Sequence, residues 1–458
     1  MGLVRAGRTR VEQALPLFCF VVALMPIDAR IAVPGLFDVS TERIALLTIA
    51  ALFLSQPRRS LIKRMPLKYL IVLHLMWLTI STCYSLSVAT SAKMMLAQGI
   101  EYYLMFYLFI NSITEIRTVL RIMYALVGCL GLCCIFGLFE AYAKWSVMSL
   151  LPSNLLLGAP LYIEAGRGLR IRATFPHPIL FGDALAMTIP IALYLLSVCK
   201  KNGQRAMLWT ITALQFWALY KTSSRGPWLT LALSIVLLWM LVKNRVRKYL
   251  IGFAVLTMIV LVARPGIRET ISNLYDSTQE SNSRLGSSYG YRHALIPAVT
   301  GALAKDSKRM WVGYGLGTFR EIGLDITFLN ITQRWHTCDD NWALFLYETG
   351  YAGLAIIALL LFKILWGALR SFWRMKRPDK NLMGTIVIGI AGFYFGLLSV
   401  AGYNWGQQGF MAWMLISLSV VYPKIVMRKA NLPDNGLAVR KNMSMADEEM
   451  RPASAVLL

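Results

Sequence analysis

Long apolar runs recur along the chain and constrain its fold more than any other feature. Because the apolar core of a bilayer is about 30 Å thick, one helical span needs roughly 20 predominantly apolar residues. Runs near this length fall at 13–32, 43–56, 68–86, 94–111, 118–140, 178–199, 206–222, 227–242, 248–264, 341–369, 382–402 and 407–426. With 57% hydrophobic and 15% charged residues, the sequence predicts an all-α, polytopic membrane bundle of about 12 spans within residues 1–430.

The loops between these runs alternate in charge, and this alternation predicts their orientation. Lys and Arg gather in the N-terminal arm, at 58–68, 117–121, 200–205, 243–248 and 370–380, and after Tyr422. Loops rich in Lys and Arg face the cytoplasm, so we expect both termini inside. Much of the net charge of +24 therefore sets orientation and does not indicate a nucleic-acid partner. Residues 431–458 are polar and aperiodic, which predicts a disordered cytoplasmic tail.

Positive charge also lies in segments predicted to be outside the cytoplasm, where orientation does not explain it. These segments are the loop at 265–340 between the ninth and tenth spans, the segment before the sixth span, and the short turn at 221–226 before the eighth span. The arginines concerned are Arg170, Arg172, Arg225 and Arg292. A guanidinium group stays charged and matches two phosphate oxygens at once, so these residues predict a site for a lipid-linked phosphate or diphosphate. Contact with lipid head groups, or snorkelling, is the alternative.

Two prolines place helix N-termini beside these arginines. Pro178 and Pro227 follow Arg172 and Arg225 closely, and proline fits the first turn of a helix because its missing N–H costs little there. The positive end of a helix dipole favours an anion. The two span starts therefore strengthen the predicted anion site.

The segment HTCDD at 336–340 leads into the tenth predicted span, which carries Glu348. A histidine or carboxylate at a span start suits general-base catalysis, so His336, Asp340 and Glu348 are the catalytic candidates. Asp340 and Glu348 are a little over two helical turns apart and would share a face if the helix begins early. Two alternatives stay open: helix capping by Asp339 or Asp340, and a metal site, although the spacing matches no standard metal motif.

Two further patterns lie in the large outer loop. Residues 289–303 have the helical spacing of an amphipathic helix, with Pro297 as a kink, lying on the membrane or across the site. Residues 313–319 read GYGLGTF. This pattern favours a tight turn over a phosphate-binding loop, because no strand and no Lys-Ser/Thr pair accompany it.

Four pieces of sequence, in this order, resemble the O-antigen ligase and polymerase superfamily of bacterial envelope glycosyltransferases. They are RATFPHP at 172–178 with Gly182, then Ser224-Arg225-Gly226, then Tyr291-Arg292 followed by 313–319, then Asp340-Asn341-Trp342 with Leu344, Glu348 and Gly350. The likeness extends over about 165–370, and the first five spans match in hydropathy alone. Order and predicted topology together carry the resemblance.

The resemblance implies a metal-independent glycosyltransferase of the bacterial inner membrane that uses no cofactor. Such an enzyme moves a glycan from an undecaprenyl diphosphate carrier to a hydroxyl of a glycan or lipid A acceptor at the periplasmic face. The family's diphosphate-binding arginines correspond to Arg172, Arg225 and Arg292. Ligases carry a histidine where this chain has Asp339 or Asp340, with His336 slightly earlier, and this departure favours a polymerase over a lipid A ligase.

A transporter of polysaccharide or lipid-linked glycan is the competing interpretation. It would require ionisable residues near the middle of the membrane. The candidates inside the predicted spans are His74, Glu101, Asp183 and Lys363. Asp183 lies close to the predicted outer end of its span, where it would instead belong with the arginine site.

Overall fold

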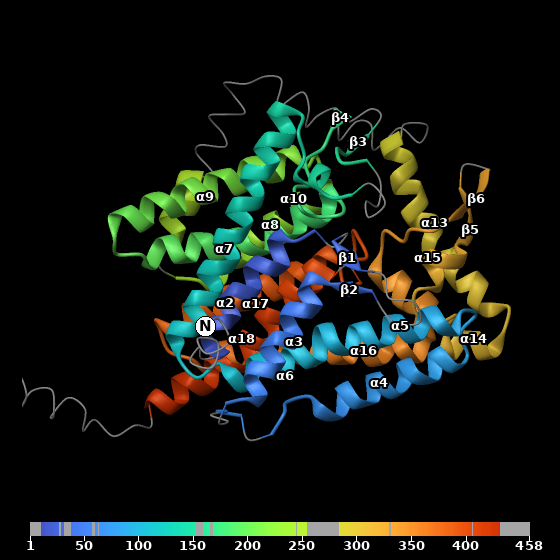
Figure 1. Cartoon of the computed structure of the whole chain (residues 1–458), viewed down its shortest axis with the longest axis horizontal. Coiled ribbons are helices and arrows are strands. Elements are labelled where there is room, and N and C mark those ends of the chain that lie inside the picture. The colour runs from blue at the N-terminus through green and yellow to red at the C-terminus, as the bar shows by residue number, and fades with distance from the viewer. Residues whose placement is uncertain are drawn as a thin grey trace, which may run out of the picture.

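Helices make up most of the structure, as the apolar runs predict (Figure 1). The computed structural model describes residues 11–26, 29–31, 38–56, 60–62, 64–152, 159–164, 168–243, 245–253, 284–328, 331–404 and 406–430. The predicted tail at 431–458, the start of the outer loop at 265–283 and most of the predicted ninth span lie outside the described residues.

The N-terminal helices coincide with the first predicted spans. They are α2 (Val11–Leu24), α3 (Thr41–Leu54), α4 (Lys68–Cys83), α5 (Val88–Gln98), the π-helix η1 (Gly99–Leu104), α6 (Met105–Ser112), α7 (Ile116–Leu138) and the π-helix η2 (Phe139–Ala143). The predicted fourth span is therefore built from α5, η1 and α6 in succession. A π-helical turn changes which side chains face inward, and such turns occur frequently at functional sites.

The remaining helices of the bundle follow the later predicted spans. They are α8 (Pro178–Val198), α9 (Asn202–Lys221), α10 (Arg225–Leu241), α16 (Asn341–Arg374), α17 (Asp379–Gly396) and α18 (Gly406–Ala430). The most apolar stretch of α8 is 94% buried, against 33% for that of α16. Accordingly, α8 is a central helix that packs against α10 and α17, and much of α16 faces outward.

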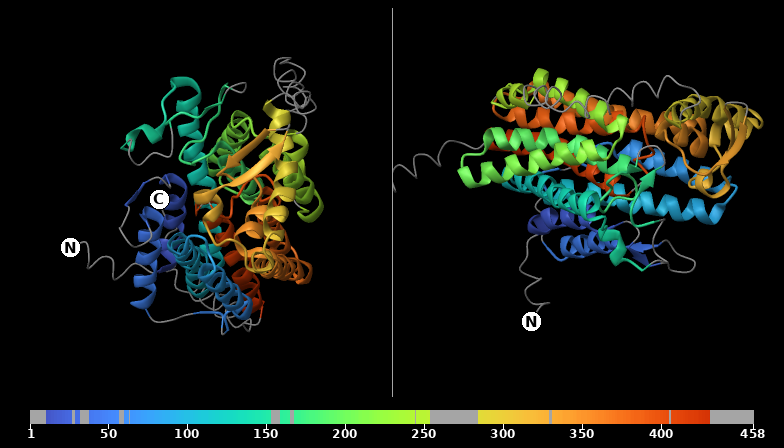
Figure 2. Two further views of the ribbon diagram at one scale, coloured as in Figure 1. Left: turned by 90° about the vertical axis from the view of Figure 1, so that its right-hand side faces the viewer. Right: turned by 90° about the horizontal axis from the view of Figure 1, so that it is seen from above.

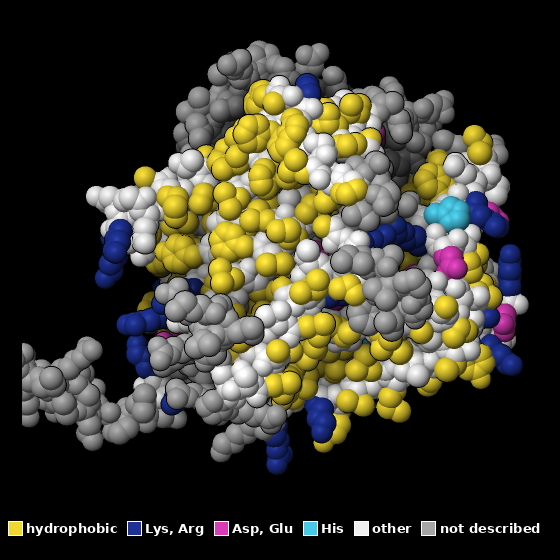
Figure 3. Space-filling model, in the orientation of Figure 1, with side chains coloured by type: hydrophobic (Ala, Val, Ile, Leu, Met, Phe, Trp, Pro, Cys, Tyr) yellow, Lys and Arg dark blue, Asp and Glu magenta, His cyan; other side chains and the backbone are white. Residues whose placement is uncertain are grey.

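Four helical segments in the described part of the chain are long and apolar enough to cross a membrane, namely 116–143, α8, α16 and α18. Three shorter apolar helices, α2, α4 and α10, accompany them. Hydrophobic side chains cover much of the molecular face in Figure 3, with Lys and Arg toward its edges. These features indicate a multi-pass membrane protein, and the number of about 12 spans stays a prediction.

The described part of the predicted outer loop is a folded unit at one end of the bundle (Figure 2). It comprises α13 (Arg284–Ala304), α14 (Ser307–Val312), α15 (Thr318–Ile322), and an antiparallel hairpin of β5 (Leu324–Phe328) and β6 (Ile331–Trp335). The predicted helix at 289–303 is confirmed as part of α13, which contains Pro297. Leu295, Phe319 and Ile326 form a separate small core within this unit.

Short strands add to the helical fold. Besides the hairpin, β1 (Arg30–Ile31) pairs with β2 (Val39–Ser40), and β3 (Ile163–Glu164) pairs with β4 (Gly168–Leu169). The all-α prediction describes the bundle but missed these strands, because the alternation of β-branched residues in 324–335 is too short to stand out within a polar loop.

Candidate functional site

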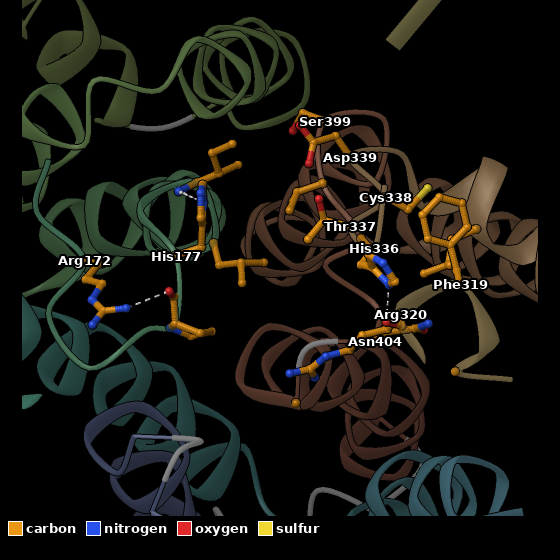
Figure 4. Close-up of a pocket in the computed structure, with 18 of the residues that line it drawn as sticks. Arg172, His177, Phe319, Arg320, His336, Thr337, Cys338, Asp339, Ser399 and Asn404 are labelled. Carbon is orange, nitrogen blue, oxygen red and sulfur yellow. Dashed lines mark hydrogen bonds between the residues drawn. The ribbon is translucent and has the colours of Figure 1, made fainter. Parts of the chain in front are cut away.

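A cavity of about 1410 Å³ brings together most of the predicted site residues. The predicted residues that line it are Arg170, Arg172, Arg225, Arg292, His336 and Glu348, whereas Asp340 does not. In Figure 4, Arg172 and His177 lie on one side of this space, and His336, Asp339 and Arg320 lie across it. The residues come from segments far apart in the sequence, so only tertiary folding assembles the site.

A buried glutamate holds the loop that carries Arg172. Glu140 lies in η2, and its Oε2 accepts hydrogen bonds from the backbone N–H groups of Arg172 at 2.8 Å and Ala173 at 3.1 Å. The Arg172 guanidinium donates to the carbonyl oxygens of Pro176 at 3.0 Å and Ala159 at 2.8 Å. Ala173 has φ = 52°, a conformation that costs free energy for a residue other than glycine. Glu140 thus stabilises a strained turn beside the cavity.

Arg170 ties two loops together. Its guanidinium forms an ion pair with Glu164 and donates to the carbonyl oxygen of Thr222 at 2.9 Å and to Ser224 Oγ at 2.7 Å. The residue is 2% exposed. Because its donors are engaged within the protein, this geometry favours a role in positioning the turn before Arg225 over direct contact with a ligand.

Arg225 and Arg292 lie close enough for their like charges to act on each other. Arg225 is the first residue of α10, so the positive end of that helix dipole adds to the local potential. Arg292 Nη2 lies 3.2 Å from Asp339 Oδ2 and donates to the carbonyl oxygen of Ser399 at 3.3 Å, while its buried Nε has no hydrogen-bond partner. Two neighbouring guanidinium groups with an available N–H suit an anion between them.

The side chain of His336 has a defined tautomer. Its Nδ1 lies 3.1 Å from the carbonyl oxygen of Arg320, and a carbonyl only accepts, so Nδ1 carries the proton. The neutral ring then has an unshared electron pair on Nε2. Since His336 is exposed and lines the cavity, it can accept a proton from a hydroxyl bound there.

Asp340 is the N-cap of α16, which is one of the alternatives left open by the sequence. Its Oδ1 accepts hydrogen bonds from the backbone N–H groups of Trp342 at 2.7 Å and Ala343 at 3.0 Å. Burial raises the pKa of Asp340, and those two N–H groups oppose the shift. Cys338 Sγ donates to the Asp340 carbonyl oxygen. The other alternative was a metal site, and within the described residues no three His, Cys, Asp or Glu side chains lie together as metal ligands.

Glu348 lies at a break in α16 and faces the cavity. Its Oε1 accepts from the Gly317 N–H at 2.8 Å, while Oε2 is buried without a hydrogen-bond partner. The glycine-rich segment forms a tight turn with positive φ at Gly313, Gly315 and Gly317, as predicted. A Cβ at Gly313 would lie 2.4 Å from the Glu348 backbone, so this close approach requires glycine.

The break itself comes from Gly350, whose φ is 69°. It frees backbone carbonyls that α4 and the glycine turn satisfy: the Glu348 carbonyl accepts from Ser81 Oγ at 3.0 Å and Gly315 N at 2.9 Å. Trp77 Nε1 donates to the Thr349 carbonyl at 3.0 Å. The sequence singled out the glycines and Glu348 separately, but not their contact.

Comparison with known families supports this assignment. Residues 210–358 match the family model described as O-antigen ligase. The predicted superfamily is thereby confirmed. The matched segment contains Arg225, Arg292, His336 and Glu348, while Arg170 and Arg172 precede it. No curated protein matches the chain.

The match and the apolar helices together indicate a multi-pass protein of the bacterial inner membrane with an O-antigen ligase or polymerase type of function. The O-antigen ligase family implies a lipid-linked glycan as the substrate. The donor carrier, the acceptor and the side of the membrane on which transfer occurs are taken up below as proposals.

Three residues at or beside this site were not predicted as site residues of a glycosyltransferase, although His177 lies within the segment 172–178 singled out above. His177 caps α8: its Nδ1 accepts from the Ile179 N–H at 3.1 Å, so Nε2 donates to the Tyr162 hydroxyl at 2.9 Å. Glu140 ends an apolar run, and a carboxylate in that position was the available signal. Glu101, considered above as a transporter residue, lines the cavity in an ion pair of 2.7 Å with Arg43.

Proposed function

We propose that this protein is a glycosyltransferase that moves a glycan from an undecaprenyl diphosphate carrier to an acceptor hydroxyl at the periplasmic face. The observation that carries the proposal is the single cavity in which Arg172, Arg225 and Arg292 lie with His336. The positive charges of these arginines suit a leaving diphosphate, and the imidazole of His336 suits an acceptor hydroxyl that must lose its proton. The acceptor is a further glycan, or lipid A.

In the proposed reaction, the acceptor oxygen attacks the anomeric carbon of the carrier-linked sugar. The bond between that carbon and the diphosphate oxygen breaks, and the diphosphate leaves with the electron pair. Arg225, Arg292 and the N-terminus of α10 stabilise the growing negative charge, which is the most effective form of catalysis for such a departure. We propose that these cations supply the charge stabilisation without a metal ion.

The acceptor proton passes to His336 Nε2 in this mechanism. A general base needs one basic atom that can reach the hydroxyl proton, and His336 is favoured over Asp340 because Asp340 Oδ1 already accepts two backbone hydrogen bonds as a helix cap. Asp340 also does not line the cavity. Glu348 contributes a buried carboxylate whose free Oε2 can accept a hydrogen bond from a sugar hydroxyl.

The experiment that tests the proposal compares the lengths of carrier-linked and surface glycans in cells with and without this gene. Long chains stranded on the carrier indicate a ligase, and single repeat units with loss of long chains indicate a polymerase. An unchanged pattern in both pools would contradict the proposal and favour a transporter. Labelling of engineered cysteines from the periplasm tests the predicted orientation of the termini and of the 284–340 unit.

A further inference from the structure

We infer that the N-terminal helices build a second subsite in the same cavity, which binds hydroxyl groups of the acceptor glycan. This inference rests on the proposed function, because it assigns the partner that receives the transferred sugar. The residues that carry it are Glu42, Gln98 and Glu101, with Arg43 paired to Glu101. The family match at 210–358 does not include any of them.

Three segments present these residues to the cavity. Glu42 lies in the first turn of α3, Gln98 ends α5, and Glu101 lies in η1. The helix α3 packs against η1, and in the view of Figure 1 both α3 and α5 lie below α8 and α13. The subsite thus comes from a different part of the bundle than Arg225 and Arg292.

Arg43 organises this wall. Its Nε and Nη2 both donate to Glu101 Oε1, at 2.9 and 2.7 Å, and its Nη1 donates to the carbonyl oxygen of Asp38. Arg30 pairs with Asp38 at 2.9 Å. The negative charges of Glu101 and Asp38 are therefore neutralised by Arg43 and Arg30.

Two buried polar atoms of this wall have no hydrogen-bond partner within the protein. They are Gln98 Nε2, a donor, and Glu42 Oε1, an acceptor, in side chains that are 5% and 2% exposed. A buried donor or acceptor without a partner costs free energy, so each requires a group from a ligand or solvent. A hydroxyl group can accept from Gln98 and donate to Glu42, whereas a phosphate only accepts.

The charge of the wall also favours sugar over diphosphate. Arg43 pairs with Glu101 and Arg30 pairs with Asp38, and the cavity lining here also includes one further residue of each sign, Lys93 and Glu42. A nearly neutral surface with both donors and acceptors suits an uncharged, polyhydroxylated ligand. The diphosphate is then attracted to Arg225 and Arg292, and the acceptor to the N-terminal wall.

The local backbone supports a binding role. The π-helix η1 follows directly after Gln98 and contains Glu101, and π-helical turns inside α-helices occur frequently at functional sites. The second π-helix, η2, carries Glu140, which holds the Arg172 loop. Glu101 in the first π-helix therefore lines the cavity itself, whereas Glu140 in the second acts on it through the loop of Arg172.

The test uses the full-length protein in proteoliposomes with a carrier-linked glycan donor and an acceptor oligosaccharide, each varied separately. Glu42→Leu and Gln98→Leu are each expected to raise KM for the acceptor about 10-fold, the loss of roughly one hydrogen bond, while KM for the donor stays within about twofold. Gln215→Leu is the matched control, because Gln215 is a buried glutamine with unpartnered amide atoms outside the cavity. Thermal unfolding of each variant reports whether the fold is retained.

Unchanged acceptor KM in both cavity variants, or a rise confined to the donor KM, would overturn the inference. Binding of the acceptor oligosaccharide, measured by saturation-transfer NMR without donor, separates this outcome from failure of the proposed function. If the wild-type protein forms no glycosidic bond, the proposed function fails. The subsite is then still supported by oligosaccharide binding that Gln98→Leu weakens and Gln215→Leu does not, and it is refuted by equal binding in all three proteins.

Discussion

Removal of the Arg292 side chain is expected to abolish most transfer while the fold persists. Arg292 is 29% exposed, and its ion pair with Asp339 is 3.2 Å long. Partly exposed pairs of this kind contribute about 0–1 kcal/mol to stability, reduced further by solvent and salt. Its Nε without a partner and its position beside Arg225 instead suit it to donate to the leaving diphosphate of the proposed reaction. Loss of one such charge-stabilising donor lowers kcat by about 10²–10³.

Arg334→Ala is the matched control for this substitution. Arg334 belongs to the same outer unit, pairs with Asp325 at 2.7 Å and is 56% exposed, but it does not line the cavity. It removes one positive charge from the same region, so any general electrostatic effect appears in both variants. The assay is initial-rate transfer in proteoliposomes at saturating donor, alongside thermal unfolding of each variant.

Wild-type kcat in Arg292→Ala would refute the assignment of Arg292 to the diphosphate. An equal loss in Arg334→Ala would refute the reasoning differently, since it would mean that net charge and not geometry governs the rate. A large fall in the unfolding temperature of Arg292→Ala alone would show that its pair with Asp339 is a major structural contact, contrary to its exposure.

Three further predictions follow from the site. His336→Asn should lower kcat by about 10²–10⁴, whereas His293→Asn, an exposed histidine outside the cavity, should leave it unchanged in the same assay. Asp340→Ala should cost about 1 kcal/mol of stability through loss of an N-cap yet keep most activity. Burial raises the pKa of Asp340 in the folded protein, so the contribution of Asp340 to the free energy of unfolding falls as the pH rises from its unfolded-state pKa toward its folded-state pKa. Asp340→Asn should remove that pH dependence when unfolding is measured at several pH values. Gly350→Ala should prevent normal folding, since its Cβ would lie 2.2 Å from the Trp311 carbonyl at φ = 69°, and a normal yield of stable protein would contradict this.

The residues of the outer unit and of the first turns of α16 show where sequence reasoning reached its limit. Arg292, His336 and Glu348 were identified because charged and polar residues are unusual in a chain this apolar. Whether each contacts the cavity depends on side-chain partners that no spacing reveals. Asp340 illustrates this: its position before an apolar run fits both a base and a cap, and only the hydrogen bonds to Trp342 and Ala343 distinguish the two.

The N-terminal wall of the cavity was inaccessible to sequence reasoning for a different reason. Glu42, Gln98 and Glu101 lie singly within or beside apolar runs, where an isolated polar residue has many explanations. Their shared position at the cavity follows from the packing of α3 against η1, and the π-helical turn that orients Glu101 leaves no recognisable pattern in the sequence.

The sequence by itself predicted a helical membrane protein that resembles the O-antigen ligase superfamily, because burial in lipid imposes long apolar runs and a few ordered motifs lie in the loops. It also determined which arginines and which histidine were worth considering. Only the tertiary structure decided that Arg170 forms an ion pair with Glu164, and that Asp340 caps α16. It also decided that the glycine-rich turn donates a hydrogen bond to Glu348 beside the break in α16. The Asp340 cap is a local contact, two and three residues along the chain. The bonds of Arg170 to Thr222 and of Glu348 to Gly317 join segments more than 30 residues apart, and local propensity cannot specify them because each requires the positions of both partners at once.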